Sequence, residues 1–541
     1  MKSTITRRGF LKGCTALTAG SLLASQDQRN DSFQKIDLAN SSSEIRIDPA
    51  PRFEVSPYMY MQFMEPLGNT DGSVEAAWDY NRDDWREDLV EVVKDLSPDA
   101  MRWGGAFIRY YKWKEGVGPP KKRPWMYNYT WGGKETNRVG TGEFSDFCRR
   151  VGAEPLMCVN LLSDGVKYYR NTIHGEDRSA DHKEAADWVS YANDPGNRAR
   201  ISHGHKDPFN IKLWQLGNEN SYLYEDGFSL EESAGHCLRF ARIMKERDPS
   251  IKLIGWGDVR NPEKLRPDTP KDDPEIQFWA PEMLKIAGEY IDYIAIHMMG
   301  IYPKDRSRIT GFEYQKDPEG AWNTLLELSD IADYRIQVLT DVLKHSYPNI
   351  GIAVTEGHLS LHPYNANMIL TEWLSAGYHA RTLNTYLRHG DRIKICTAAD
   401  FCGTRWTVNA VTMAVPRGVS FLLPVASIMR LYKHHLGSHG IQVEAAPEGL
   451  DVAATRKGST IYLHVLNMNY NQSVKTIFSV KGTSLAKGRI YEIAPENARE
   501  YVNQNRPEVF LPKEKTIKSK EPLEWTFPAR SVSAVELDLK V

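Results

Sequence analysis

The sequence of 541 residues has few cysteines, no surplus of charge of one sign and no long apolar run, and each absence excludes a class of protein. The six cysteines form no CxxC pair, so neither a disulfide scaffold nor a thiolate zinc site is predicted, and we interpret them as small buried residues. With 68 basic and 70 acidic residues, the chain has no global electrostatic reason to bind nucleic acid or an anionic membrane. No integral membrane segment is expected in the mature chain, because no stretch is long and apolar enough.

The first 25 residues have the layout of an export signal. Thr6–Lys12 is basic and contains Arg-Arg-Gly-Phe-Leu-Lys, and the short apolar run Gly13–Ala24 follows it. This run is too short to span a bilayer, and the paired arginines resemble the twin-arginine signal, which is an address read by a receptor. We therefore predict a twin-arginine signal peptide at residues 1–25, cleaved near Ala24, and a periplasmic or extracellular mature protein.

A barrel of alternating strands and helices is predicted after a polar, flexible spacer at residues 26–43. From residue 56 to 410, short apolar runs alternate with amphipathic stretches, which is the rhythm of βα units around a parallel sheet. Eight such strands fit a (β/α)8 barrel with long loops, whereas the alternative, an open doubly wound sheet, lacks its glycine-rich phosphate-binding fingerprint. The expected strands are Tyr58–Glu65, Ala100–Trp103, Pro155–Leu161, Ile211–Gly217, Ile251–Trp256, Tyr290–His297, Gly351–Glu356 and Ile393–Ala398. The helices expected between them include Asp83–Leu96, Glu143–Val151, Leu230–Arg247, Ile336–His345 and Asn365–Leu387.

The character of the chain changes near residue 411. From there to residue 541, short alternating segments such as Ile461–Leu466 and Val532–Leu537 are separated by Gly, Pro and Asn, which predicts an antiparallel β-sandwich. A further strand at residues 44–55 is expected to join this sandwich, so that the barrel is inserted between its two parts. The predicted fold class is α/β, a (β/α)8 TIM barrel with an accessory C-terminal antiparallel β-sandwich.

Two of the expected barrel strands end in a glutamate. Ile211–Gly217 is followed by Asn218 and Glu219, and Gly351–Glu356 closes on Glu356. Barrel enzymes gather their catalytic side chains at the C-terminal ends of the strands. Cleavage of a glycosidic bond needs one carboxylic acid to protonate the departing oxygen and one carboxylate to attack or to activate water. A single glutamate would be interpreted as a solvated or ion-paired residue, but a pair, with Asn218 placed to bind a substrate hydroxyl, predicts a glycoside hydrolase.

Further stretches strengthen this hypothesis: Tyr60–Gly68, Met101–Phe107 with Trp113–Pro119, Val151–Pro155 with Val159–Leu161, and Asp292–His297. Together with Gly217-Asn218-Glu219, they resemble clan A of the glycoside hydrolases and, more closely, glycoside hydrolase family 51, the α-L-arabinofuranosidases. The resemblance runs from about Ile45 into the C-terminal sandwich and implies a retaining reaction through a covalent glycosyl-enzyme intermediate. It implies that Glu219 is the general acid/base and Glu356 the nucleophile.

Candidate substrate-binding residues surround this pair. The resemblance implies that Glu65 helps to hold the sugar and that His297 lies beside the nucleophile; the alternatives are a buried ion pair and a core histidine. Arg102 is expected to keep the nucleophile ionised, whereas Trp113 either lines the subsites or only packs. No metal and no cofactor are expected, since a two-carboxylate mechanism requires neither. The full set of substrate-binding candidates is Glu65, Arg102, Trp113, Asn218, His297, Tyr302 and His358.

Three positions depart from the family pattern where the sugar in the cleavage subsite would be recognised. Ala106 stands where the family has Asn, Met299 where it has Tyr, and Gly357 where it has Trp. Lost hydroxyl-binding groups change specificity strongly, so the glycone is left open.

The expected function is that of an exported, retaining, exo-acting glycosidase that removes furanosyl residues during polysaccharide degradation. A first alternative is a glycosidase of the same clan that acts on β-D-galactofuranosides or β-xylosides, or an endo-glucanase. A second, of another class, is a catalytically inactive carbohydrate-binding protein. The expected partner is an oligo- or polysaccharide, and the resemblance also implies that a homo-oligomer can form.

Overall fold

The computed structural model describes residues 43–270, 273–299, 306–517 and 522–540. The expected signal peptide, the spacer and Tyr302 lie outside these residues. None of the described helices has both the length and the apolar character that a membrane crossing requires. Each cysteine in the described ranges is buried and unpaired, as the sequence predicts.

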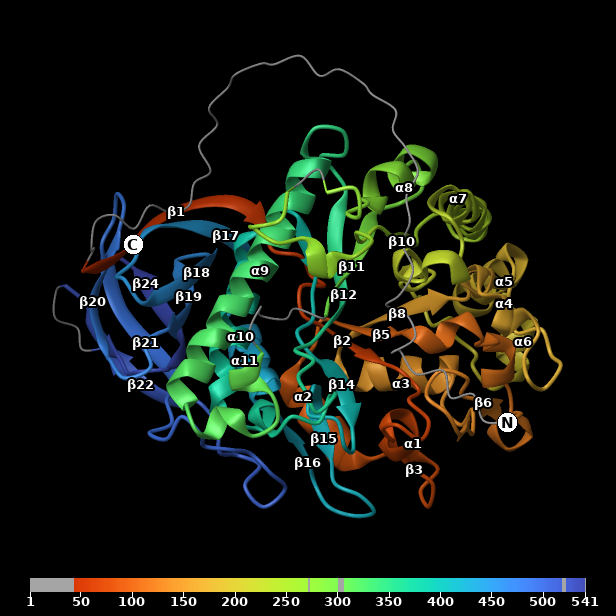
Figure 1. Ribbon diagram of the computed structural model, residues 1–541, viewed down its shortest axis with the longest axis horizontal. Coiled ribbons are helices and arrows are strands. Elements are labelled where there is room, and N and C mark those ends of the chain that lie inside the picture. The colour runs from red at the N-terminus through yellow and green to blue at the C-terminus, as the bar shows by residue number, and fades with distance from the viewer. Residues whose placement is uncertain (1–42, 271–272, 300–305, 518–521, 541) are drawn as a thin grey trace. The chain divides into compact units, whose positions relative to one another are not determined.

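Eight parallel strands form a closed barrel at the centre of the chain (Figure 1). Adjacent strands pair in parallel throughout, and the barrel closes where Met61 N donates to Cys396 O at 2.8 Å. The predicted fold class is therefore confirmed for this part, and each expected strand overlaps an observed one. The strands are β2 Met61–Met64, β5 Ala100–Trp103, β8 Glu154–Val159, β9 Leu213–Leu216, β10 Lys252–Trp256, β11 Tyr293–Met298, β12 Gly351–Gly357 and β13 Ile393–Ile395.

A buried apolar layer fills the barrel. It contains one small or aliphatic side chain from each strand, so that the interior is packed rather than hollow. Because both faces of the strands are covered, their sequences are apolar runs rather than alternating patterns. The residues of this layer are Met61, Ala100, Leu156, Leu213, Ile254, Ala295, Ala353 and Ile395.

Amphipathic helices surround the barrel. In α7 (Leu230–Arg247), the Ser229 side chain accepts from Glu232 N while the Glu232 side chain accepts from Ser229 N, which is the capping box that the sequence encodes. The helix α9 (Pro318–Lys344) begins with Asp317 as its N-cap and proline at its first position, and it is far longer than its expected C-terminal part. The other helices around the barrel are α2 Glu87–Leu96, α3 Thr141–Val151, α5 His182–Asn193, α8 Trp279–Ala287 and α10 Ala376–Arg388.

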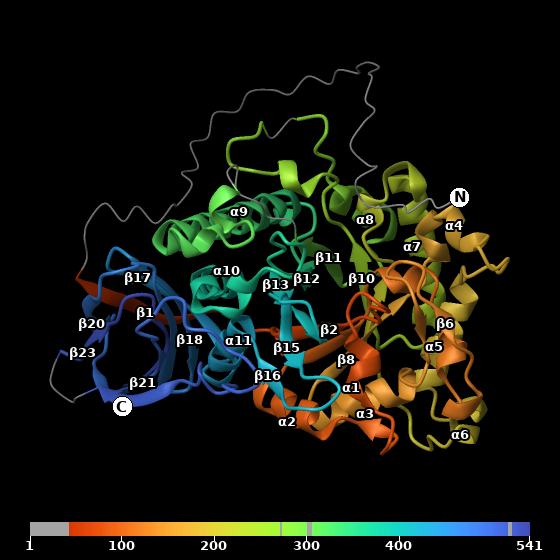
Figure 2. The ribbon, with the colours of Figure 1, turned by 60° about the horizontal axis from the view of Figure 1, so that its bottom comes forward.

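A nine-stranded sheet forms the second part of the fold (Figure 2). It curls around its own apolar core, so that its two edge strands, β22 and β23, come close to one another. Glu492 of β21 accepts a hydrogen bond from Lys515 of β22 and another from Trp525 of β23. The sheet is mixed rather than purely antiparallel, since β1 (Glu44–Glu54) pairs in parallel with β20 and antiparallel with β17. The other strands are β17 His439–Ala445, β18 Leu450–Lys457, β19 Thr460–Asn467, β20 Val474–Val480, β21 Leu485–Ile493, β22 Lys513–Ile517, β23 Glu524–Phe527 and β24 Val532–Leu539.

Residues 400–434 differ from the sandwich expected from residue 411 onward. They form a separate three-stranded sheet of β14 (Asp400–Gly403), β15 (Asn409–Met413) and β16 (Ser420–Leu422), followed by α11 (Pro424–His434). Proline at the first position of α11 favours a helix start, and most of the helix is buried. The strands of the large sheet therefore resume only at β17.

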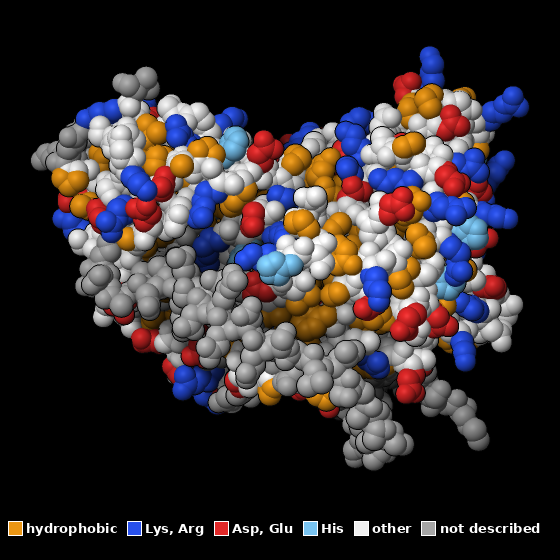
Figure 3. Space-filling model, turned by 90° about the horizontal axis from the view of Figure 1, so that it is seen from above, with side chains coloured by type: hydrophobic (Ala, Val, Ile, Leu, Met, Phe, Trp, Pro, Cys, Tyr) orange, Lys and Arg blue, Asp and Glu red, His pale blue; other side chains and the backbone are white. Residues whose placement is uncertain are grey.

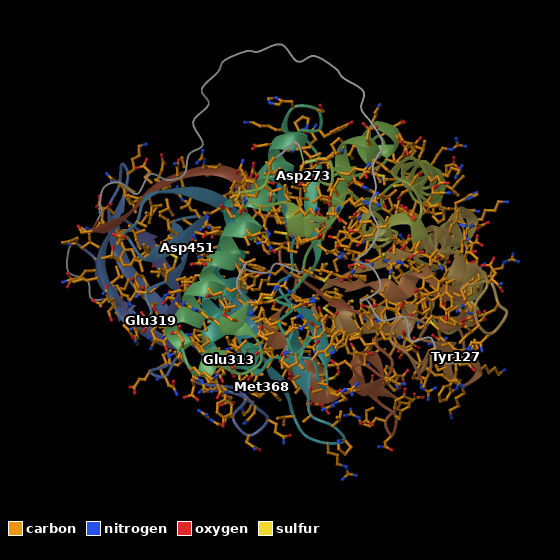
Figure 4. The ribbon with its side chains drawn as sticks, in the orientation of Figure 1. Tyr127, Asp273, Glu313, Glu319, Met368 and Asp451 are labelled. Carbon is orange, nitrogen blue, oxygen red and sulfur yellow. The ribbon has the colours of Figure 1, made fainter. Side chains whose placement is uncertain are left out.

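Polar contacts join the large sheet to the barrel helices. Asp451 of β18 binds Arg388 at 2.9 Å and Asn384 at 2.7 Å, both from α10 (Figure 4). Trp373 Nε1 donates to the carbonyl of Arg530 at 2.9 Å. On the surface, basic and acidic side chains are interspersed over the face in Figure 3.

Candidate active site

Glu219 and Glu356 meet at the C-terminal end of the barrel. Glu219 follows β9 in a left-handed backbone conformation with φ of 57°, and Glu356 lies near the end of β12. A carboxylate oxygen from each and a ring nitrogen of His297 all lie within 4.8 Å of one another. The two carboxylate side chains are only 12 % and 8 % exposed. The two glutamates are therefore close enough to act on one small group.

His297 lies between the two carboxylates. Its Nδ1 is 3.2 Å from Glu219 Oε1 and 3.6 Å from Glu356 Oε2. Its Nε2 lies 3.2 Å from Thr355 Oγ1, and its backbone N donates to Asp258 Oδ2 at 3.0 Å. The strand register sets this position, because His297 of β11 pairs directly with Glu356 of β12.

Arg102 holds the Glu356 side of the site. Its fully buried guanidinium donates to Glu356 Oε1 at 3.0 Å, to Gln215 Oε1 at 2.8 Å and to Asn218 Oδ1 at 2.6 Å. A charge-assisted hydrogen bond of this kind both orients the carboxylate and stabilises its negative charge.

The Asn218 side chain has one free donor. Because its Oδ1 accepts from Arg102, the amide orientation is fixed and Nδ2 is presented to the site. This buried nitrogen has no hydrogen-bond partner within the described residues. An unpaired buried donor costs free energy unless something binds it, so Nδ2 is a candidate contact for a substrate hydroxyl.

Arg109 and Asp164 hold the turn that carries Glu219. Arg109 donates from Nε to Asp164 Oδ2 at 3.2 Å and from Nη2 to the carbonyl of Asn218 at 2.6 Å, and Nη2 is 3.6 Å from Glu219 Oε2. Asp164 also accepts from Asn218 N at 3.3 Å and from Asn220 Nδ2 at 3.2 Å. Burial raises the pKa of Asp164 to about 6, although Arg109 and these donors oppose the shift.

Glu65 forms the third acidic group of the site. Its Oε1 accepts from Trp131 Nε1 at 3.0 Å and from Phe107 N at 3.2 Å. Burial, reinforced by the negative charge of Glu356, raises the pKa of Glu65 to about 8. Its surroundings therefore favour the protonated carboxyl, whose second oxygen can donate a hydrogen bond.

The two remaining described candidates, His358 and Trp113, have different surroundings. His358 Nδ1 lies 2.7 Å from Asp400 Oδ1, and the charge of Asp400 acts on Glu65, so this pair borders the site. Trp113 is not brought to it: its ring stacks on Trp188 with centroids 5.9 Å apart, and its Nε1 donates to the carbonyl of Glu184. These contacts agree with the packing role that was considered for Trp113.

Of the three departures from the family pattern, Gly357 has a clear steric consequence. A side chain in place of Gly357 would meet the carbonyl oxygen of Thr397 at 2.6 Å, so the strand packing leaves no room for one without a shift. Ala106 begins η2 (Ala106–Arg109), the short helix that also supplies Arg109.

Several residues of the site were missed by the sequence analysis. They lie in the segments that follow barrel strands, and that position is the signal that could have found them. They are Arg109, Trp131, Asp164 and Asp400.

Glu219, His297 and Glu356 could together offer three ligands to a metal ion. However, Arg102 already places a positive charge 3.0 Å from Glu356, and Arg109 places one 3.6 Å from Glu219. These two guanidinium groups disfavour a further cation at the same carboxylates.

A family model and curated relatives point to the α-L-arabinofuranosidases. The model of the alpha-L-arabinofuranosidase 1 domain matches residues 92–309. The chain is 30 % identical over 365 residues to an intracellular exo-α-(1→5)-L-arabinofuranosidase of Halalkalibacterium halodurans, over 64 % of this chain and 67 % of that one. A relative of the same description from Acetivibrio thermocellus is 29 % identical over 376 residues, with the same coverage.

Solved structures share the fold over nearly the whole chain. An arabinose complex of the α-L-arabinofuranosidase from Thermotoga maritima has a TM-score of 0.68 at 24 % identity, covering 92 % of this chain and 100 % of that one. The family 51 arabinofuranosidase from Xanthomonas axonopodis pv. citri has a TM-score of 0.72 at 19 % identity, covering 92 % and 99 %.

Proposed function

Because this chain belongs to glycoside hydrolase family 51, the α-L-arabinofuranosidases, and is therefore a glycoside hydrolase, we propose that it removes terminal α-L-arabinofuranosyl residues with retention of configuration. In this proposal Glu356 is the nucleophile and Glu219 the general acid/base. The substrate is an arabinose-containing oligo- or polysaccharide, as the names of its relatives suggest.

The observation that carries the proposal is the proximity of Glu219 and Glu356. Retaining enzymes hold their two carboxyl groups about 5 to 5.5 Å apart, whereas inverting enzymes leave about 6.5 to 9.5 Å for a water molecule. An approach of oxygen atoms within 4.8 Å agrees with the shorter separation. Direct attack by one carboxylate is therefore favoured over attack by a water molecule lodged between the two.

In the first half of the reaction, a Glu356 oxygen attacks the anomeric carbon as the bond from that carbon to the leaving oxygen breaks. Glu219 gives its proton to the leaving oxygen. Arg102 orients the attacking carboxylate through its 3.0 Å hydrogen bond. His297, at 3.2 Å from Glu219 and 3.6 Å from Glu356, keeps the two carboxyl groups in place.

In the second half, Glu219 takes a proton from a water molecule, whose oxygen attacks the anomeric carbon and releases Glu356. Asn218 Nδ2 and protonated Glu65 supply hydrogen-bond donors to the sugar hydroxyls. A donor next to the reacting carbon stabilises the transition state more than the ground state, because its hydrogen bond strengthens as positive charge develops on the ring. The unpaired Nδ2 of Asn218 supports this role.

The proposal is tested with aryl glycosides that differ in the sugar. The panel contains α-L-arabinofuranoside, β-D-galactofuranoside, β-D-xyloside and β-D-glucoside, assayed with the native chain and with Glu356→Gln. Release from the arabinofuranoside by the native chain alone is expected. Glu154→Gln is the matched control, because Glu154 begins β8 at the opposite end of the barrel. Turnover of another glycoside in its place would reject the glycone, and turnover of none would favour a binding-only role.

Azide distinguishes the two glutamates. In Glu219→Ala, an aryl substrate with a good leaving group still forms the glycosyl-enzyme, and azide then restores turnover and forms a glycosyl azide of retained configuration. The same treatment of Glu356→Ala is expected to give the opposite anomer. If Glu219→Ala gave the inverted azide, the two roles would have to be exchanged.

Export by the twin-arginine route is a separate part of the proposal. It is supported by the basic Arg-Arg-Gly-Phe-Leu-Lys segment and by the short apolar run Gly13–Ala24. The relatives named above are described as intracellular, so location requires its own measurement. Fractionation of a bacterial host is expected to find the cleaved native chain outside the cytoplasm and the Arg7→Lys/Arg8→Lys chain inside. Equal distributions would reject this part.

A further inference from the structure

Two loops at the C-terminal end of the barrel bring five aromatic side chains together. One loop follows β5 and the other follows β8. We call this cluster the tyrosine surface; it consists of Tyr127, Tyr129, Tyr168, Tyr169 and His174.

The rings form a connected set. Tyr127 stacks on His174 with centroids 3.8 Å apart, and Tyr129 lies 6.3 Å from Tyr127. Tyr129 meets Tyr168 edge-on at 5.9 Å, and Tyr168 meets Tyr169 at 5.4 Å. Figure 4 places Tyr127 near the right-hand edge of the molecule.

The surface is not part of the core. Tyr168 is 42 % exposed, and the neighbouring Ile173 is 74 % exposed. Tyr127, Tyr129 and Tyr169 are partly exposed as well. Contiguous exposed aromatic side chains mark a binding site more often than isolated ones do.

The tyrosine surface is continuous with the candidate active site. Tyr169 packs on the buried Tyr110 with centroids 5.2 Å apart, and Tyr129 packs on the same ring at 5.3 Å. Tyr110 directly follows Arg109, whose guanidinium lies 3.6 Å from Glu219. Tyr169 also acts electrostatically on the Arg109 guanidinium, so the tyrosine surface borders the Arg109 side of the site.

The strand order assigns the tyrosine surface to one side of the reaction. The strands β9, β8 and β5 follow one another in the barrel, so both loops lie on one side of Glu219, whereas Glu356 lies three strands away in the opposite direction, at β12. The general acid protonates the leaving oxygen, so the leaving group lies on the side of Glu219. This step rests on the proposed function. We propose that the tyrosine surface binds further sugar rings of the leaving-group portion of the polysaccharide.

The chemistry of the tyrosine surface suits sugar rings. An aromatic face packs on the apolar C–H face of a sugar, while neighbouring polar groups bind its hydroxyls. Such groups are present: Thr130 Oγ1 lies 3.3 Å from Tyr169 OH, and Lys134 Nζ lies 4.8 Å from the Tyr127 ring centroid. Both polar side chains are exposed and so available to a ligand.

The test compares two substrates in the Tyr127→Ala/Tyr168→Ala variant. One is the aryl α-L-arabinofuranoside, which has no sugar on the leaving side, and the other is an α-1,5-linked arabino-oligosaccharide of five units. Loss of two stacking contacts is expected to lower kcat/KM on the oligosaccharide roughly tenfold or more, mainly through KM. Turnover of the aryl substrate is expected to stay within about twofold. Tyr501→Ala is the control, because Tyr501 is 45 % exposed, similar to Tyr168, and contributes no ring to the tyrosine surface.

Each outcome separates this inference from the proposed function. An unchanged ratio of the two kcat/KM values in the variant, with aryl turnover intact in the native chain, rejects the tyrosine surface and leaves the function standing. If the native chain hydrolyses neither substrate, the proposed function fails. Calorimetric titration of the oligosaccharide into native and variant chains then decides: weaker binding by the variant supports a sugar-binding surface, and equal or absent binding rejects it.

Discussion

Arg109 and Asp164 form an enclosed ion pair, with Nε to Oδ2 at 3.2 Å, whose remaining contacts hold the backbone on which Glu219 stands. Both side chains are nearly or fully buried. Because the turn at Glu219 is left-handed, its geometry depends on these contacts rather than on local preference.

Removal of the cation from this pair is expected to damage both stability and activity. In Arg109→Met a buried carboxylate loses its partner, which costs roughly 3 to 5 kcal/mol of unfolding free energy. Chemical denaturation measures that loss, and initial rates on the aryl substrate measure the accompanying fall in kcat. A loss below about 1 kcal/mol would show that the pair is not the support described here.

The matched variant is Arg109→Met/Asp164→Asn. It leaves no unpaired charge, so its unfolding free energy is expected to exceed that of Arg109→Met alone. If Glu219 also needs the guanidinium, kcat will stay low in the double variant although stability returns.

Asn218→Ala is expected to lower kcat/KM on the arabinofuranoside about a hundredfold, because one transition-state hydrogen bond is lost. The contact is identified with the 2-deoxy substrate, which lacks the hydroxyl that Nδ2 is proposed to bind. The native chain is expected to discriminate strongly against it, whereas Asn218→Ala should treat both substrates nearly alike. Equal discrimination by both chains would assign Nδ2 to another partner.

Activity is expected to fall as pH rises through about 8, the raised pKa of Glu65. Below that pH the carboxyl is neutral and donates a hydrogen bond; above it, the carboxylate repels Glu356 and has no proton to donate. Glu65→Gln cannot titrate, so its pH profile should lack this basic limb. Glu135→Gln is the control, because burial also raises the pKa of Glu135, to about 7, outside the catalytic cluster. Persistence of the limb in Glu65→Gln would assign it to another group.

Buried His379 is expected to make the fold sensitive to acid. Burial lowers its pKa to about 3, whereas its unfolded value is 6.5, so below pH 6.5 the unfolded chain binds a proton that the folded chain does not. The contribution of neutral His379 to the free energy of unfolding is therefore complete above pH 6.5. It falls by about 1.4 kcal/mol per pH unit as the pH decreases toward 3. Denaturation at pH 7 and pH 5 is expected to show a smaller difference for His379→Leu than for the native chain, with the exposed His345→Gln as the control. Equal differences for all three chains would contradict this account.

The sequence predicted those parts of the fold that local patterns encode. The strand at Ala100–Trp103 and the helix at Leu230–Arg247 were predicted with their observed bounds, because an apolar run marks the strand and a helical pattern of apolar residues marks the helix. The start of α9 was missed although Asp317 and Pro318 offered the signal, since the expectation followed only its apolar C-terminal part.

The site was only partly predictable. Glu219 and Glu356 each come at the end of an apolar strand, and this position can be recognised in the sequence. Their proximity then follows from the closure of the barrel. Arg109 could not be found in this way, because its role depends on how the loop after β5 folds back onto the turn after β9. Trp113 is the opposite case. It follows β5, as Arg109 does, but its ring stacks on Trp188.

The place of β1 determines when the fold can be completed. This strand lies between β17 and β20 in the large sheet, so residues near the start of the described chain pair with residues about four hundred positions later. During synthesis the barrel can form first, whereas β1 must stay unpaired until β17 has left the ribosome, and the sheet is complete only after β24. Deletion of β1 would interrupt the backbone pairing of the sheet, because among the described strands β20 and β23 are connected to the others by strand pairing through β1 alone.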